Sequence, residues 1–551
     1  MKFYKKILIA FSVLLLSLLV LAFSSCSNKD VKDGVTYDGN IAIDCDKNAT
    51  EVVLRDGTVG ISTGAFAGCT SLTKITIPSS VSSILPGAFA NCNALFEGQG
   101  EIKYADNWVI YASAETENVV IKDGTVGIAY EAFSNCPEIR TVYIPDSVKY
   151  IGKSAFYGAN KLTDITLPFI GSNASTNKYL GFLFGALSSS YNSQYVPKSL
   201  KTVTLTNEKN VARECFAECA NITTIQISNT ALTIADQAFA KCTGLTAIKI
   251  PDSVTSIGDY AFTECHSLMD VEISDNVTTI PLFAFKGCIS LSEITIPESV
   301  TNIEACALAN CSNLTTVNLP KGLKAIGQQV FDGCNKLSTI EISSGEIGKG
   351  AFNECASLQN VTIGANVTKI CDNAFFSCIS LTNVTFEEGS ILETIGEEAF
   401  CYCPFTELNL PENLKEIGDN TFYNCKELKY FKIPDSVTKI GNNAFFNCIN
   451  LIETKGHVDY VDGWIVGAFP AITYIVIDEN VRGIINSAFT KCTNLDAVYF
   501  DYTQDGTIAT VSNIGILNSH FESADKYYYT ESDTQDGTGW HYLNGVPTVW
   551  H

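Results

Sequence analysis

The 551-residue chain has few of the residues that bind nucleic acid or carry acid–base chemistry. It contains 5 histidines, and its 36 lysines and arginines stand against 59 acidic residues, which gives a net charge of −23. Such a surface repels phosphate backbones and anionic membrane surfaces. We therefore expect no nucleic-acid partner. Acidity also keeps proteins soluble, so it does not indicate a function by itself.

Common catalytic and metal-binding motifs are also missing. No histidine lies in an HExxH motif, no two cysteines have CxxC spacing, and there is no P-loop or GxGxxG motif. Carboxylates are abundant, but no spacing singles out a hydrolytic pair. We therefore predict that the protein is not an enzyme and holds no metal or cofactor.

Two similar segments, residues 501–507 and 533–538, are rich in Asp, Thr and Gly. Oxygen-bearing side chains around a glycine turn suit Ca²⁺, but both segments lack the terminal glutamate of an EF-hand loop. Ordinary turn formation explains the same residues. The sequence leaves calcium binding at these segments undecided.

The first 25 residues have the composition of a secretory signal peptide. Three lysines precede an apolar run from Ile7 to Phe23, and the small residues Ser24 and Ser25 stand before Cys26. This ending resembles a bacterial lipobox, which implies that Cys26 is lipidated and becomes the mature N-terminus. The alternative is an uncleaved transmembrane anchor. Both predict an exported chain that is tethered to a membrane.

The rest of the chain is dominated by one repeat. An Ala-Phe pair or a close variant precedes a cysteine by two residues at fifteen places, and from Cys219 to Cys334 the step is 23 residues five times running. Ala159 replaces the cysteine in one further copy. Two steps of 44 residues each hold a degenerate turn, and the step from Ala159 to Cys219 contains an insertion at 169–200.

The repeat consensus, IGxxAFxxCxxLxxIxIPxxVxxI, predicts a coil of a solenoid. LxxIxI alternates apolar and polar residues at its end, as in a strand with one buried face, and proline closes the strand. Phe and Cys three residues apart predict one turn of a short helix that faces the interior. One 23-residue unit cannot bury these groups alone, so we expect a parallel β-sheet rod of about 18 stacked coils.

This consensus resembles the BspA-like leucine-rich repeats of bacterial surface proteins. The resemblance covers about residues 50–500, includes variant WxV-type turns at Trp108 and Trp464, and extends to the C-terminal end. We accordingly predict a signal peptide at 1–25, a lipidated linker and cap at 26–50, the leucine-rich repeat solenoid at 51–500, and a capping segment at 501–551.

The repeat cysteine is interpreted as a buried packing residue that lines the interior of the solenoid. Ala159 occupies the same position in one coil, and packing tolerates such a change whereas thiol chemistry does not. Identical positions in neighbouring coils run parallel instead of facing each other, which disfavours disulfides. We therefore predict mostly reduced, buried thiols.

The exposed residue between the two strand isoleucines forms a polar row along the predicted sheet, without an aromatic stripe. Exposed threonine is common in strands for structural reasons, yet a whole row makes an extended surface of the kind that solenoids use for binding. The candidate interaction residues are Thr76, Tyr143, Thr166, Thr204, Gln226, Lys249, Glu272, Thr295, Asn318, Glu341, Thr362, Thr385, Asn409, Lys432 and Tyr499.

The insertion supplies three further candidates, Tyr179, Tyr191 and Tyr195, in a Ser- and Asn-rich context typical of adaptable contacts. The family resemblance implies a non-enzymatic cell-surface lipoprotein, plausibly an adhesin that binds proteins or glycans of host or neighbouring cells. The alternatives are a structural envelope protein without a host ligand and a carbohydrate-binding module. The sequence does not identify the ligand.

Overall fold

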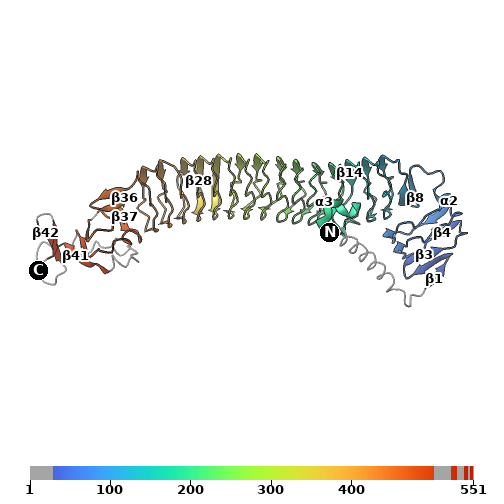
Figure 1. The fold of residues 1–551 in the computed structure, drawn as a ribbon, viewed down its shortest axis with the longest axis horizontal. Coiled ribbons are helices and arrows are strands. Elements are labelled where there is room, and N and C mark those ends of the chain that lie inside the picture. The colour runs from blue at the N-terminus through green and yellow to red at the C-terminus, as the bar shows by residue number, and fades with distance from the viewer. Residues whose placement is uncertain (1–28, 479, 502–522, 530–538, 544–545, 550–551) are drawn as a thin grey trace, which may run out of the picture. The chain divides into compact units, whose positions relative to one another are not determined.

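The computed structural model describes residues 29–478, 480–501, 523–529, 539–543 and 546–549. The chain forms two compact units, one up to Thr230 and one from Ala231 onward. The described residues form a β-solenoid of about 20 turns with very little helix, close to the 18 coils predicted. Stacked strands run through both units (Figure 1).

Each regular turn contributes one strand to a long-strand face and a shorter strand to a second sheet. The long-strand face of the first unit contains β4 (Glu51–Val53), β6 (Lys74–Thr76), β10 (Asn118–Val120), β12 (Thr141–Tyr143), β14 (Asp164–Leu167), β15 (Thr202–Leu205) and β17 (Thr224–Gln226). The second sheet contains β5 (Gly60–Ile61), β7 (Ser83–Ile84), β9 (Trp108–Ala112), β11 (Gly127–Ile128), β13 (Tyr150–Ile151) and β16 (Asn210–Val211).

The second unit repeats this arrangement. Its long-strand face contains β19 (Ala247–Lys249), β21 (Asp270–Glu272), β23 (Glu293–Thr295), β25 (Thr316–Asn318), β27 (Thr339–Ile347), β28 (Asn360–Ile370), β29 (Asn383–Phe386), β31 (Glu407–Asn409), β33 (Tyr430–Lys432), β38 (Tyr474–Ile477) and β40 (Ala497–Phe500). Its short strands are β18 (Thr233–Ile234), β20 (Ser256–Ile257), β22 (Thr279–Ile280), β24 (Asn302–Ile303), β26 (Ala325–Ile326), β30 (Thr394–Ile395), β32 (Glu416–Ile417), β34 (Lys439–Ile440), β37 (Trp464–Ala468) and β39 (Gly483–Ile484), and β27 and β28 continue into this sheet.

The strands pair in parallel and in the register that the repeat predicts. In β12 and β14, for example, Val142 lies beside Ile165 and Tyr143 beside Thr166. The middle residue of each strand points inward and its two neighbours point outward, because side chains alternate along a strand. The predicted solenoid and its buried and exposed positions are therefore confirmed.

The Ala-Phe-x-x-Cys segment differs from the predicted helical turn. Phe285 and Cys288 are both fully buried, as expected, and the Cys288 N–H donates to the Phe285 carbonyl at 3.2 Å. The turn does not continue as a helix because two residues are left-handed, Phe283 directly before the segment at φ +54° and Gly287 within it at φ +72°. Equivalent positions in other turns repeat this geometry, and residues such as Glu264 adopt it without being glycine.

Stacked phenylalanines fill the interior. In the second unit, the rings of Phe239, Phe262 and Phe285 are parallel, with centroids 5.0 and 5.2 Å apart. The repeat glycine matters for a related reason: a Cβ at Gly258 would lie 2.4 Å from the Asp236 nitrogen of the preceding turn. The glycine is therefore required by the close approach of adjacent turns.

Three antiparallel hairpins interrupt the regular turns. They are formed by β2 (Val35–Asp38) and β3 (Ile41–Cys45), by β8 (Ile102–Ala105) and β9, and by β36 (Val458–Val461) and β37. Each hairpin adds its second strand to the second sheet and none to the long-strand face. The predicted WxV-type turns at Trp108 and Trp464 are the second and third hairpins, and both indole rings pack against a glycine, Gly127 or Gly483.

Additional strands lie at the ends of the described chain and beside the third hairpin. β1 (Lys29–Lys32) pairs with β2, and β35 (Glu453–Lys455) pairs with β36. After β40 the sheet continues through β41 (Asp525–Tyr529) and β42 (Gly539–Leu543) to β43 (Val546–Val549). β42 and β43 are antiparallel, and the indole N–H of Trp540 donates to the Phe500 carbonyl at 2.9 Å. These contacts support the proposal that residues 501–551 cap the solenoid.

Candidate interaction surface

The structure brings the predicted row together as neighbouring residues of the long-strand face. Where neighbouring long strands pair, a row member lies beside the corresponding residue of the next strand, as with Glu341, Thr362 and Thr385. Thr166, Thr204, Thr362 and Tyr499 are half-buried, and the other members are exposed: Thr76, Tyr143, Gln226, Lys249, Glu272, Thr295, Asn318, Glu341, Thr385, Asn409 and Lys432.

Several row residues bind one another between turns. Lys249 forms an ion pair with Glu272, and the Asn318 side chain donates to the Thr295 hydroxyl at 3.1 Å. In the first unit, the Thr204 hydroxyl donates to the side-chain amide oxygen of Gln226 at 3.3 Å. Such exposed contacts contribute little stability. Their effect is to hold the polar side chains in a fixed ladder.

A companion row lies beside the predicted one and was missed in the sequence. It consists of the first residue of each long strand, which shares the outward face because side chains repeat every two residues. Thr141 donates to Asn118 at 2.7 Å, and Asn383 donates to Asn360 at 2.7 Å. The two-residue period of the strands could have revealed this row in the sequence. The exposed face is thus two side chains wide.

The 169–200 insertion is an ordered element anchored to the following turn. It contains the 3₁₀ helices η1 (Leu180–Phe184) and η2 (Ser189–Tyr191) and the short helix α3 (Asn192–Tyr195). The fully buried Asn192 accepts a hydrogen bond from Gly181 N–H at 2.9 Å. Its amide donates to the Cys215 and Ala217 carbonyls at 3.3 and 3.2 Å.

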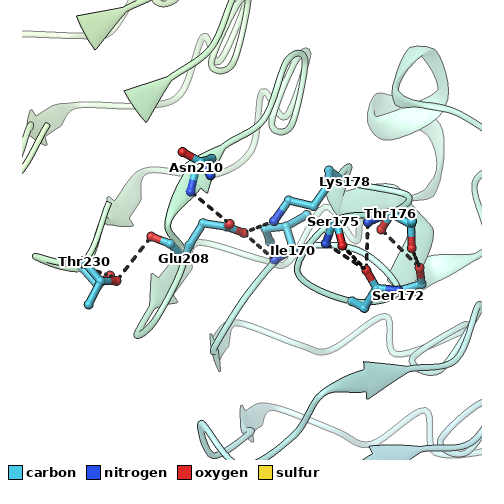
Figure 2. Close-up of polar contacts among 10 residues, drawn as sticks. Ile170, Ser172, Ser175, Thr176, Lys178, Glu208, Asn210 and Thr230 are labelled. Atoms are coloured by element: carbon cyan, nitrogen blue, oxygen red, sulfur yellow. Dashed lines mark hydrogen bonds and ion pairs between the residues drawn. The ribbon is translucent and has the colours of Figure 1, made fainter. Parts of the chain in front are cut away.

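Glu208 provides the second anchor of the insertion (Figure 2). Its carboxylate is 2 % exposed, forms an ion pair with Lys178, and accepts a hydrogen bond from Ile170 N–H at 3.0 Å. The same carboxylate accepts from Asn210 N–H at 3.4 Å. One side chain after β15 therefore fixes both the beginning and the middle of the insertion.

The predicted tyrosines divide into two kinds. Tyr191 and Tyr195 are exposed and meet edge to face, with ring centroids 6.5 Å apart. Tyr179 is half-buried and donates its hydroxyl to the Ala186 carbonyl at 3.3 Å, so it is engaged within the insertion. Tyr157, which the sequence did not single out, is exposed, and its ring and that of Tyr195 both lie against Gly185.

The repeat cysteines form the wall that was predicted. Every described cysteine is buried except Cys306 and Cys371, which are partly exposed. The Cys288 thiol donates to the Phe262 carbonyl of the preceding turn at 3.3 Å, and this contact recurs along the second unit. Burial raises the pKa of the Cys288 thiol well above its ordinary value, so the reactive thiolate is disfavoured. Their redox state remains a prediction.

One short segment matches a catalytic motif by chance. Residues Gly60 to Gly64 read GxSxG, the pattern of the nucleophile elbow in hydrolases. An elbow requires a strand that leads directly into a helix. Here β5 leads into the turn that contains Ala65 and Phe66, and the Ser62 N–H donates to the Ala42 carbonyl at 2.9 Å. The pentapeptide is a repeat corner.

Among the described residues, no group of three or more His, Cys, Asp and Glu side chains is arranged to hold a metal. No helix in this part of the chain is long and apolar enough to cross a membrane. Cys26 and the signal segment lie outside the described residues, as do residues 533–538 and all of 501–507 except Asp501.

Comparison with known proteins identifies the class. The BspA-type leucine-rich repeat region matches in six copies, at residues 40–163, 97–204, 209–338, 255–369, 345–461 and 416–516. The chain therefore belongs to the BspA-type leucine-rich repeat family, a class of repeat scaffolds that is typically non-catalytic and serves protein interaction. The earlier resemblance is confirmed.

Solved structures include similar chains. A leucine-rich repeat protein from Bacteroides ovatus is 23% identical, with 79% of this chain and 97% of that chain covered and a TM-score of 0.41. A leucine-rich cell surface protein from Faecalibacterium prausnitzii is 24% identical, with 66% and 96% covered and a TM-score of 0.28. No curated protein sequence matches the chain.

Proposed function

We propose that the protein is a non-enzymatic, membrane-anchored surface lipoprotein whose long-strand face binds proteins or glycans of host or neighbouring cells, as an adhesin. The observation that carries this proposal is the two-residue-wide polar face, held in register along successive turns. Its side chains are fixed by a stacked interior, so an extended partner meets a surface that requires little ordering on binding.

The absence of charge uniformity on this face favours a polar partner without strong net charge. The row carries two lysines, Lys249 and Lys432, and two glutamates, Glu272 and Glu341, among neutral polar residues. Specificity on such a surface arises from many matched hydrogen bonds along the partner. The exposed pair of Tyr191 and Tyr195 on the insertion adds a local aromatic contact in the first unit.

Binding is tested with the full chain against extracellular-matrix proteins and a glycan array. In the variant Glu272→Lys/Thr295→Lys/Glu341→Lys, we expect at least a tenfold loss of affinity for the ligands found, because the row is disrupted at three turns. The matched control is Asp275→Lys/Glu427→Lys, at exposed turn residues outside the long strands. No binding by the unmodified chain, or equal binding by both variants, contradicts the proposal.

The anchor is tested separately. Incorporation of a labelled fatty acid during expression, followed by membrane fractionation, should show a lipidated membrane protein. Cys26→Ala should abolish both the label and the membrane association, because the acylated thiol is removed. Membrane association without the label would indicate the alternative transmembrane anchor.

A further inference from the structure

The second hairpin leaves a free strand edge on the long-strand face of the first unit. In regular turns, the N–H that follows a long strand donates to a carbonyl of the next turn, as Ile144 N–H does to Thr166 at 2.9 Å. After β6, the corresponding Ile77 N–H donates to the Asp106 carboxylate of the hairpin at 2.9 Å instead. β6 pairs only with β4 among the described strands.

The open groups follow from the alternation of a parallel ladder. Thr76 directs its carbonyl to β4, where Leu54 N–H donates to it at 3.0 Å. Successive residues of a strand pair on opposite edges. The N–H and carbonyl of Ile75 therefore face away from β4, toward the hairpin. These groups are a template for a further strand.

A hollow of about 580 Å³ lies beside β6 and would hold such a strand. Residues of β6 line one wall, and Gln99, Tyr104 and Lys122 line the other. The Gln99 amide is already used, since it accepts from Tyr104 N–H at 2.7 Å and donates to the Tyr104 carbonyl at 2.9 Å. The volume lies in the range of ligand sites.

The hollow is locally cationic although the whole chain is acidic. Lys74 and Lys122 line it; the Lys74 ammonium lies 4.0 Å from the exposed Glu51 carboxylate, and the Lys122 ammonium lies 4.1 Å from the centre of the Tyr104 ring. Asp106, the acidic residue of the lining, directs its carboxylate to Ile77 N–H. Charge complementarity therefore favours an acidic occupant.

The third hairpin shows how the end of such an edge is closed. Asp462 accepts a hydrogen bond from Ile433 N–H at 2.8 Å, as Asp106 does from Ile77. There, however, the Arg482 guanidinium donates to the Ile433 and Pro434 carbonyls at 2.9 and 3.1 Å. Val126 stands at the position that corresponds to Arg482, directly before the glycine under the tryptophan. Ile433 and Pro434 correspond to Ile77 and Pro78, so Arg482 caps the end of the equivalent edge, and the β6 edge lacks a guanidinium at its Ile77 carbonyl.

We propose that the free edge of β6 binds an extended acidic peptide segment of a partner protein as an added strand. Main-chain hydrogen bonds to Ile75 hold the segment, and its carboxylates meet Lys74 and Lys122. This site adds the backbone edge of β6 to the outward side chains of the long-strand face, because recognition rests on main-chain hydrogen bonds.

Fluorescence anisotropy with the full chain tests the proposal, using a labelled ten-residue peptide of alternating glutamate and threonine. We expect saturable binding that weakens at least tenfold in Val126→Arg, which supplies the guanidinium found in the third hairpin. Lys74→Glu/Lys122→Glu should weaken binding to a similar extent. Lys149→Glu, at an exposed lysine outside the hollow, is the control and should leave binding unchanged.

Two N-methylated forms of the peptide test the backbone contacts. One peptide is N-methylated at its odd-numbered residues and the other at its even-numbered residues. One of the two should lose binding and the other should keep it, because alternate N–H groups face the edge. Absence of binding overturns the proposal. Equal binding to Val126→Arg and to the unmodified chain, or equal binding of both N-methylated peptides, overturns it as well.

Discussion

At the residue scale, the buried thiol is a packing group that also donates a hydrogen bond to a neighbouring turn. Cys265, Cys288 and Cys311 repeat the same contact to a phenylalanine carbonyl at 3.2 to 3.3 Å. A thiol is a weak donor, so its contribution lies in filling a small corner without leaving a strong polar group unpaired. The cysteines predicted as interior packing residues therefore also satisfy a carbonyl of the neighbouring turn.

The thiols should make stability sensitive to alkaline pH. Burial raises the pKa of Cys311 and Cys378 to about 12 from the ordinary value of 9.0. Because the folded pKa is raised, the stabilisation is complete below pH 9 and is lost as pH rises from 9 toward 12. Each such thiol should remove about 1.4 kcal/mol of unfolding free energy per pH unit in this window.

Urea unfolding in reductant, at pH values from 7.5 to 10.5, measures this dependence. Cys311→Ala/Cys378→Ala is the comparison, since two of the titrating groups are removed and alanine already occupies one repeat position, Ala159. The variant should lose stability less steeply above pH 9. Identical slopes for both proteins would contradict the assignment.

Glu208 should be the most sensitive polar residue of the insertion. Glu208→Ala leaves the Lys178 ammonium, which is mostly buried, and the Ile170 N–H without their acceptor. Removing one partner of a buried ion pair costs about 3–5 kcal/mol. Hydrogen exchange should then show faster opening of residues 169–200, whereas Glu388→Ala, at an exposed residue far along the chain from the insertion, should not. Equal protection in both variants would exclude the anchor role.

At the scale of the element, the stack of rings couples each turn to the next. In the second unit, Phe352 lies parallel to Phe331 and to Phe375, with both centroid distances at 5.1 Å. Between Phe285 and Phe331 the equivalent residue is Leu308, which is fully buried but cannot stack. In most turns, left-handed residues before the phenylalanine and before the cysteine turn the chain so that both side chains enter the interior.

Phe352→Ala should lower the free energy of unfolding by about 3–5 kcal/mol, since it removes a fully buried ring and leaves a cavity between two rings. Phe376→Ala is the matched control, because this half-buried ring lies one residue after the stacked Phe375. Chemical denaturation of both variants measures the difference. A smaller loss for Phe352→Ala than for Phe376→Ala would contradict the interior role of the stack.

At the scale of the whole molecule, each unit is a series of turns that pair with their neighbours along the stack. Strands such as β23 and β25 pair through three consecutive residues, and each turn repeats the connection to the next. Stability in such a protein is a sum of turns and of interfaces between adjacent turns. A complete turn is therefore the natural unit of insertion and deletion.

Deletion of residues 266–288, one 23-residue period, should give a folded protein. The junction joins Cys265 to Ile289 and restores the Cys-x-x-Leu spacing through Leu291. Thermal unfolding followed by circular dichroism should retain the β-sheet signal and shift the midpoint by a few degrees. Deletion of 266–276 alone breaks the register and should abolish the cooperative transition. A cooperative transition in both deletion variants would contradict the conclusion that the 23-residue turn is the unit of the fold.

Much of the candidate surface followed from periodicity, and some of it did not. The row from Thr76 to Tyr499 was predicted because the outward residue recurs with every turn. The order of the insertion was not, since the contacts of Asn192 and Glu208 join residues up to 38 positions apart. The hairpins were recognised as variant turns through Trp108 and Trp464, but their effect on the long-strand face depends on pairing with other turns.

The sequence by itself determined the class of fold, the inward and outward positions and the family, because identical apolar positions can be buried only by stacking one turn on the next. The tertiary structure alone decided where that stacking is interrupted. The hairpin between β6 and β10 withholds a strand, and Val126 stands where Arg482 caps the end of the equivalent edge. Whether an edge is paired depends on backbone groups from separate turns, and no local pattern records their proximity.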